Sequence, residues 1–86
     1  MPEICRFYGI VIQLYYGDHP PVHFHAIYGE HVAKIGIETL EIIDGSLPER
    51  ALRLVHEWAR LHERELRDAF ELASNFQRPP KIEPLP

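Results

Sequence analysis

The segment from Glu49 to Arg78 contains neither glycine nor proline, and this run constrains the fold more than any other feature of the chain. Because glycine and proline are the residues that usually end regular structure, such a run is typical of a helix. The preceding half is instead rich in β-branched and aromatic residues that are interrupted by turn signals, which indicates strands. The sequence therefore predicts an α+β domain in which the strands come first.

Alternating apolar residues and turn signals divide the first half into four expected strands. These are Gly9–Tyr16, His23–Tyr28, His31–Ile37 and Leu40–Asp44. Gly29-Glu30, between the second and third strands, fits a two-residue hairpin turn in which glycine supplies the positive φ at the first position. We therefore expect a mostly antiparallel four-stranded sheet.

The second half predicts one long helix over residues 47–76, because its apolar residues recur at steps of three and four. Ser46 and Glu49 match a capping box at its start. At about 1.5 Å per residue the helix would be about 45 Å long, more than a small sheet can cover. It must either break near residues 61–63 or overhang and pack on a second copy, and we favour the overhang and a homodimer. Residues 77–86 are rich in proline and predict an extended tail outside a domain of residues 1–76.

Size and composition restrict the class of protein. The chain has 86 residues, a net charge of −4 and one cysteine, so it forms one domain without an internal disulfide. An acidic chain argues against broad DNA binding, which depends on Lys and Arg neutralising phosphates. The start of the chain resembles no signal peptide, and no apolar stretch reaches the roughly 20 residues of a membrane span. We expect a cytoplasmic protein with no membrane segment and no cofactor.

The segment "HPPVHFH", residues 19–25, is the densest group of histidines in the chain. If Gly29-Glu30 is the turn, residues whose numbers sum to 59 lie opposite each other, so Lys34 lies opposite His25. His23 and His25 are two residues apart and point to the same face of the sheet, which we expect to be the face away from the helix. Tyr15 shares this face if the first two strands pair.

The histidine segment supports a metal site as one interpretation. His23 and His25 have the spacing of two imidazole ligands, and His19 or Asp18 could add a third from the loop. Lys34 argues against this site because a lysine beside His25 repels a dication. The metal hypothesis therefore uses His19, His23 and His25, with Asp18 as the other loop candidate.

Phosphate chemistry without a metal is a second interpretation of the same face. His23 and His25 would act as acid and base, Lys34 would stabilise the developing charge and Tyr15 would orient the substrate, as in a metal-independent endoribonuclease. A third interpretation is that these half-exposed histidines carry no chemistry. The residues alone leave open whether the protein is an enzyme.

The order of segments resembles a known family. "DHPPVHFHAIYGE" and the Arg-Glu-Leu motif at Arg64–Leu66 are its most specific elements, and the likeness covers nearly the whole chain. It resembles the bacterial and archaeal family called domain of unknown function 4160, which has no established activity. Members are suggested to belong to toxin–antitoxin-type gene pairs, beside a small protein of the family called domain of unknown function 2442. The resemblance thus implies a component of a two-protein module with a partner encoded nearby. A non-catalytic protein that docks its partner through the helix and the tail is the alternative.

Overall fold

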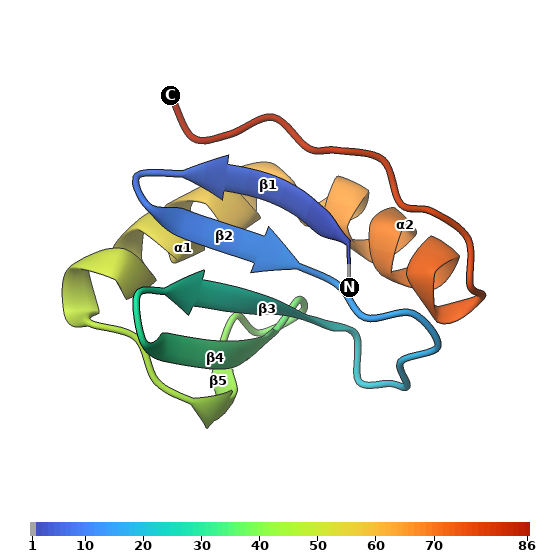
Figure 1. Cartoon of the computed structure of the whole chain (residues 1–86), viewed down its shortest axis with the longest axis horizontal. Helices are drawn as coiled ribbons and strands as arrows, with labels where there is room; N and C mark the ends of the chain where they lie inside the picture. The colour runs from blue at the N-terminus through green and yellow to red at the C-terminus, as the bar shows by residue number, and fades with distance from the viewer. Residues whose placement is uncertain (1) are drawn as a thin grey trace.

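A computed structural model describes residues 2–86 as one antiparallel sheet with two helices (Figure 1). The five strands lie in the sheet in the order in which they occur in the chain, β1-β2-β3-β4-β5. The elements are β1 (Glu3–Phe7), β2 (Ile10–Gln13), β3 (His23–Tyr28), β4 (His31–Gly36), β5 (Ile42–Gly45), α1 (Glu49–Leu61) and α2 (Glu63–Ser74). The α+β class and the antiparallel sheet are therefore confirmed.

The helices cover one face of the sheet, and the core lies between the two layers (Figure 1). Ile12, Phe24 and Ile35 are fully buried on neighbouring strands, as the alternating pattern predicts. Trp58 from α1 packs edge-on against Phe24, with 5.9 Å between ring centroids. The opposite face of the sheet is left without a helix above most of its area.

The predicted hairpin register between β3 and β4 is confirmed. His25 lies opposite Lys34, and Tyr28 lies opposite His31 on either side of the Gly29-Glu30 turn. Gly29 has a φ of 59°, the left-handed conformation that this turn requires and that glycine adopts without steric cost. The turn residues therefore determine which side chains share a face.

The prediction of four strands was wrong, because β1 precedes them. It pairs with β2 through a tight turn at Tyr8-Gly9, in which both residues have positive φ, 48° and 81°. A tyrosine at such a position is uncommon, so the turn had only its glycine as a signal. The expected strand Gly9–Tyr16 is correspondingly shorter and stops at Gln13, although the Leu14 N–H still bonds to the Pro2 carbonyl, at 3.1 Å.

The fourth expected strand, Leu40–Asp44, begins later than predicted, and the third expected strand, His31–Ile37, ends one residue earlier than predicted. Residues 36–40 form a turn closed by the Leu40 N–H on the Gly36 carbonyl, at 2.9 Å, and Leu40 itself has a φ of 61°. The expected strand Leu40–Asp44 is therefore β5, and the expected His31–Ile37 is β4, each with the bounds given above.

The favoured alternative of one unbroken, overhanging helix was wrong, and the other alternative, a break near residues 61–63, is confirmed, because the helix breaks at His62. This residue leaves the helical conformation, with φ −126° and ψ 26°, and its ring nitrogen Nδ1 lies 2.6 Å from the Glu65 carboxylate. The break falls where the length argument placed it, and it lets α2 turn back to the domain. No overhanging half remains, so the reason for expecting a dimer through the helix disappears.

The predicted capping box does not form. Pro48 occupies the N-cap position of α1, and no side chain there bonds to the backbone. The Ser46 N–H instead bonds to the carbonyl of Val32 in β4, at 3.2 Å. Ser46 therefore belongs to the end of the sheet rather than to the start of the helix.

The proline-rich tail has no regular secondary structure, as expected, but it packs against the domain. Its Ile82 N–H bonds to the Ile4 carbonyl of β1, at 2.8 Å, and the Ile82 and Leu85 side chains are buried. The Trp58 indole N–H donates to the Glu83 carbonyl, at 2.8 Å. The tail thus runs beside the β1 edge (Figure 1) and contributes to the core.

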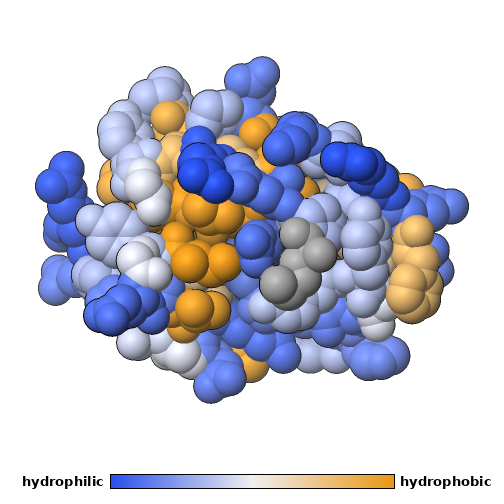
Figure 2. All heavy atoms as spheres, viewed as in Figure 1, coloured by the Kyte–Doolittle hydropathy of each residue, from blue (hydrophilic) through white to orange (hydrophobic). Residues whose placement is uncertain are grey.

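The face away from the helices carries two cross-strand rows of side chains. One row is apolar and contains Val11, Ile27 and Val32, which are paired in register. Figure 2 shows a hydrophobic patch on this face over the middle strands. The other row is polar, with Gln13 opposite His25 and Lys34 beyond it.

Both helices are too short and too polar to cross a membrane, and residues 2–86 contain no other helix.

Candidate metal centre

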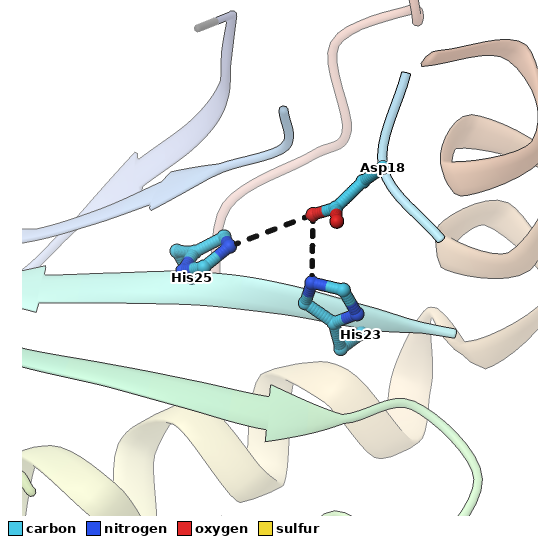
Figure 3. Close-up of side chains that lie close together, drawn as sticks. All are labelled: Asp18, His23 and His25. Carbon is cyan, nitrogen blue, oxygen red and sulfur yellow. Dashed lines mark hydrogen bonds and ion pairs between the residues drawn. The ribbon is translucent and has the colours of Figure 1, made fainter. Parts of the chain in front are cut away.

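Three side chains that can bind a metal converge where β3 begins (Figure 3). They are Asp18 from the loop after β2 and His23 and His25 from β3. His23 Nε2 lies 2.8 Å from Asp18 Oδ2, and His25 Nε2 lies 3.8 Å from the same oxygen. One potential ligand atom from each residue lies within 4.8 Å of the other two.

His23 is buried, which corrects the expectation that both histidines are half-exposed and lie clear of the helices. Its side chain is 2% exposed, because α2 passes the end of the sheet and brings Phe70 against it, with 5.3 Å between ring centroids. The loop that carries Asp18 passes close to the ring and directs this side chain toward it (Figure 3). The break at His62 brings α2 into this position, so the burial could not follow from one unbroken helix.

Each ring nitrogen of His23 faces a hydrogen-bond acceptor. Its Nδ1 lies 2.7 Å from the Pro21 carbonyl oxygen, which can only accept, so Nδ1 carries a hydrogen and donates it. Its Nε2 lies 2.8 Å from the Asp18 carboxylate. With a metal, the same tautomer directs the Nε2 lone pair toward the ion.

His25 has a ring nitrogen without a hydrogen-bond partner. Its Nε2 is buried and faces Asp18 at 3.8 Å, too far for a hydrogen bond. The ring is held in place by Tyr15, which stacks on it with 4.0 Å between centroids and 10° between planes. Burial, and then the neighbouring His23, hold the pKa of His25 below its usual 6.5, which favours a neutral imidazole.

Asp18 supplies the negative charge of the cluster. Burial alone would raise the pKa of this carboxyl, but the His19 backbone N–H and the rings of His23 and His25 outweigh that effect and hold the pKa below its usual value. The His19 N–H donates to Asp18 Oδ1 at 3.0 Å. Oδ1 is therefore held by the loop, whereas Oδ2 faces the two histidines.

The structure selects Asp18 rather than His19 as the third member of the cluster. His19 is exposed and contributes its backbone N–H, while its ring is not part of the group. The predicted metal set of His19, His23 and His25 is therefore corrected to Asp18, His23 and His25. The sequence signal was the Asp-His pair before the two prolines, but it did not show which of the two side chains turns inward.

Lys34 and Tyr15, the other predicted site residues, both lie next to His25. Tyr15 stacks on its ring, and Lys34 lies opposite it in the β3–β4 register. Asp44 lies opposite Lys34 on the far side, in β5. Lys34 and Asp44 form no ion pair within residues 2–86, so the Lys34 charge still disfavours a cation at the cluster.

The cluster has dimensions that suit a tetrahedral metal ion. With bond lengths of about 2.0–2.1 Å to N and O ligands, neighbouring ligand atoms in a tetrahedron lie about 3.3 Å apart. The separations of 2.8 Å and 3.8 Å to Asp18 Oδ2 lie on either side of that value, and the ligand atoms of His23 and His25 lie within 4.8 Å of each other.

Taken together, the fold and the cluster define a small α+β protein with two histidines and one carboxylate gathered at the end of a sheet. Residues 9–71 match the family described as Domain of unknown function (DUF4160), which is most of the chain. The chain belongs to this family, as the resemblance of its histidine segment and helix indicated. No curated protein and no solved structure matched the chain.

Proposed function

We propose that the protein binds a divalent transition-metal ion through Asp18, His23 and His25. The observation that carries the proposal is the buried, unpartnered His25 Nε2, which faces a carboxylate and a second imidazole within 4.8 Å. A buried polar atom without a partner costs about 1–3 kcal/mol, and a bound metal would remove that cost. Two imidazoles and one carboxylate are also a recurrent ligand set for transition metals.

The surroundings of the ligands support the same conclusion. The Pro21 carbonyl accepts the Nδ1 hydrogen of His23, as an outer partner of a metal-bound histidine commonly does. Tyr15 restrains His25, and the His19 N–H restrains Asp18. Three protein ligands leave a fourth position for water or another small ligand, and the nitrogen and oxygen atoms suit Zn²⁺, Ni²⁺, Co²⁺ or Fe²⁺.

Zinc titration of the full chain without a histidine tag tests the proposal. We expect one equivalent to bind, and at 100 times the dissociation constant it should stabilise the fold by about 2.7 kcal/mol. Asp18→Asn and His25→Gln should each weaken binding by roughly 100-fold or more, since even outer partners contribute 10–100-fold. His19→Gln is the matched control, because this exposed histidine lies beside the cluster and is not part of it. Equal loss in the control and in the ligand variants would contradict the proposal.

A second proposal is metal-independent action on RNA phosphates, and the adjacency of His25 and Lys34 favours it. His25 is held neutral, as a general base must be, and Lys34 lies opposite it to stabilise a developing charge. His23 would serve as the acid and Tyr15 would orient the substrate. This proposal ranks second because His23 is 2% exposed and its two nitrogens already face Pro21 and Asp18.

This second proposal includes the setting that the family resemblance implies. The protein would be the active component of a cytoplasmic, toxin–antitoxin-like pair, with a small partner protein encoded nearby. Expression alone should then arrest growth, and the purified chain should cleave RNA in the presence of a chelator. Lys34→Gln should abolish both effects without lowering the melting temperature. Cleavage that requires added metal, or no cleavage at all, would contradict it.

A further inference from the structure

The sheet has one covered edge and one open edge. The tail covers β1, where the Ile82 N–H bonds to the Ile4 carbonyl. β5 (Ile42–Gly45) forms the other edge, and within residues 2–86 no strand lies beyond it. One side of β5 pairs with β4, so alternate N–H and C=O groups on its outer side can accept an additional strand.

A groove follows this open edge on the side of the sheet away from α1. Its apolar part is formed by Pro21, Val22, Ile42 and Ile43. Gly36 keeps it open, because a side chain there would meet the Ile43 side chain and the Thr39 hydroxyl. Ile43 is 46% exposed, although it is a large aliphatic residue on an edge strand. The edge therefore offers backbone hydrogen bonds and an apolar contact at the same place.

The charged residues around the groove are acidic. Glu38 and Glu41 line it, Asp44 follows in β5, and no lysine or arginine lines the groove in the part of the chain that the structure describes. Glu38 has one loose contact with Arg67, at 3.8 Å between exposed side chains. Glu41 has no ion pair among residues 2–86, and Asp44 lies opposite Lys34 in the β4–β5 register. An occupant with positive charge would therefore be attracted.

We propose that β5 and this groove bind an extended segment of a partner protein, in which lysine or arginine flanks an aliphatic residue. The segment pairs with the outer side of β5 as a sixth strand, and its aliphatic side chain packs on Ile43. Its basic residues lie near Glu38 and Glu41. The proposal does not depend on a bound metal, although the groove adjoins the cluster, because Pro21 lines the groove and its carbonyl accepts the His23 Nδ1 hydrogen.

Charge argues against a second copy of this chain as the occupant. Two β5 strands paired edge to edge would bring Glu41 and Asp44 of one copy close to the same residues of the other. Like charges on paired strands are unfavourable. A basic partner segment removes this repulsion and satisfies the same backbone groups.

Selection from a phage-displayed library of random nine-residue peptides, with the full chain as target, tests the proposal. The selected peptides should carry Lys or Arg on both sides of an aliphatic residue. A synthetic copy of the strongest binder should shift the amide NMR signals of Ile42–Gly45. Exchanging its basic residues for glutamate should weaken binding at least tenfold, and so should 0.5 M salt relative to 0.05 M salt.

Two charge-reversal variants complete the test. Glu41→Lys should weaken the basic peptide at least tenfold, whereas Glu30→Lys, at the exposed β3–β4 turn, should leave its affinity within twofold. Equal melting temperatures establish that both variants fold. The proposal is overturned if no peptide is enriched, if enriched peptides are acidic, or if the shifts map away from β5. It is also overturned if sedimentation shows a dimer that Glu41→Lys abolishes, because the occupant is then a second copy.

Discussion

Replacing Ile82 with alanine tests whether the proline-rich tail belongs to the folded domain. The Ile82 side chain is 5% exposed, and it lies where the tail bonds to the backbone of Ile4. The substitution removes buried methyl and methylene groups but keeps this backbone hydrogen bond. The change in stability therefore reports the packing of one side chain of the tail against the sheet.

The expected loss follows from the burial. Ile→Ala substitutions in protein cores cost about 2–5 kcal/mol, and the cost is smaller where neighbouring groups can move into the space. A single chain segment at the molecular surface can move inward, so we expect about 2–3 kcal/mol for Ile82→Ala. For a domain of this size, that loss lowers the melting temperature by roughly 10–20 °C.

Urea denaturation followed by Trp58 fluorescence measures the free energy of unfolding, since the indole N–H bonds to the tail at Glu83. Lys81→Ala is the matched control, because it shortens an exposed side chain next to Ile82. It should change stability by less than about 0.5 kcal/mol. If Ile82→Ala behaves like this control, the tail does not pack on β1. The alternative in which a free tail docks a partner would then regain support.

Three further results are expected. Gly45→Ala should cost about 2 kcal/mol or more in urea denaturation, because Gly45 has a φ of 79° and an added Cβ would collide with the Val32 carbonyl. A cost below about 0.5 kcal/mol would refute this backbone geometry at Gly45. Trp58→Phe should cost about 1–3 kcal/mol in urea denaturation followed by far-UV circular dichroism, because the Glu83 carbonyl loses its donor. An unchanged stability would refute that contact. With a chelator present, the free energy of unfolding of the wild-type chain should decrease as the pH falls below 6.5, because the folded state lowers the pKa of His25 and so favours its neutral form. The stability that His25 contributes is complete above pH 6.5 and is lost as the pH falls through the lowered pKa of the folded state. His25→Gln should flatten the melting-temperature profile between pH 7 and pH 5, and an unaltered profile would contradict the burial of this ring.

Local sequence rules predicted the middle of the sheet correctly, because the determinants there are short-range. Gly29 sets the β3–β4 turn, and alternation then fixes the faces of His25 and Lys34. Tyr15 was predicted to share the face of His25; it lies beyond the end of β2, and its stacking on that ring was not predicted. The predicted faces needed no knowledge of the helices.

The errors arose where distant segments meet. The helix break at His62 has no glycine or proline to mark it, so the sequence could limit its position only by the length that the sheet can cover. The burial of His23 depends on α2 and could not be predicted without that break. Asp18 and His19 are adjacent in one loop, and only the path of the loop decides which side chain faces β3. Tertiary packing therefore determined the third member of the cluster.

The most direct test of the metal centre is long-range ¹H–¹⁵N NMR of the six imidazole rings, recorded with and without one equivalent of Zn²⁺. The account predicts that Nε2 of His23 and of His25 takes the chemical shift of a metal-bound nitrogen. The rings of His19, His31, His56 and His62 should keep their metal-free signals. Coordination through His19, or unchanged signals from His23 and His25, would contradict it.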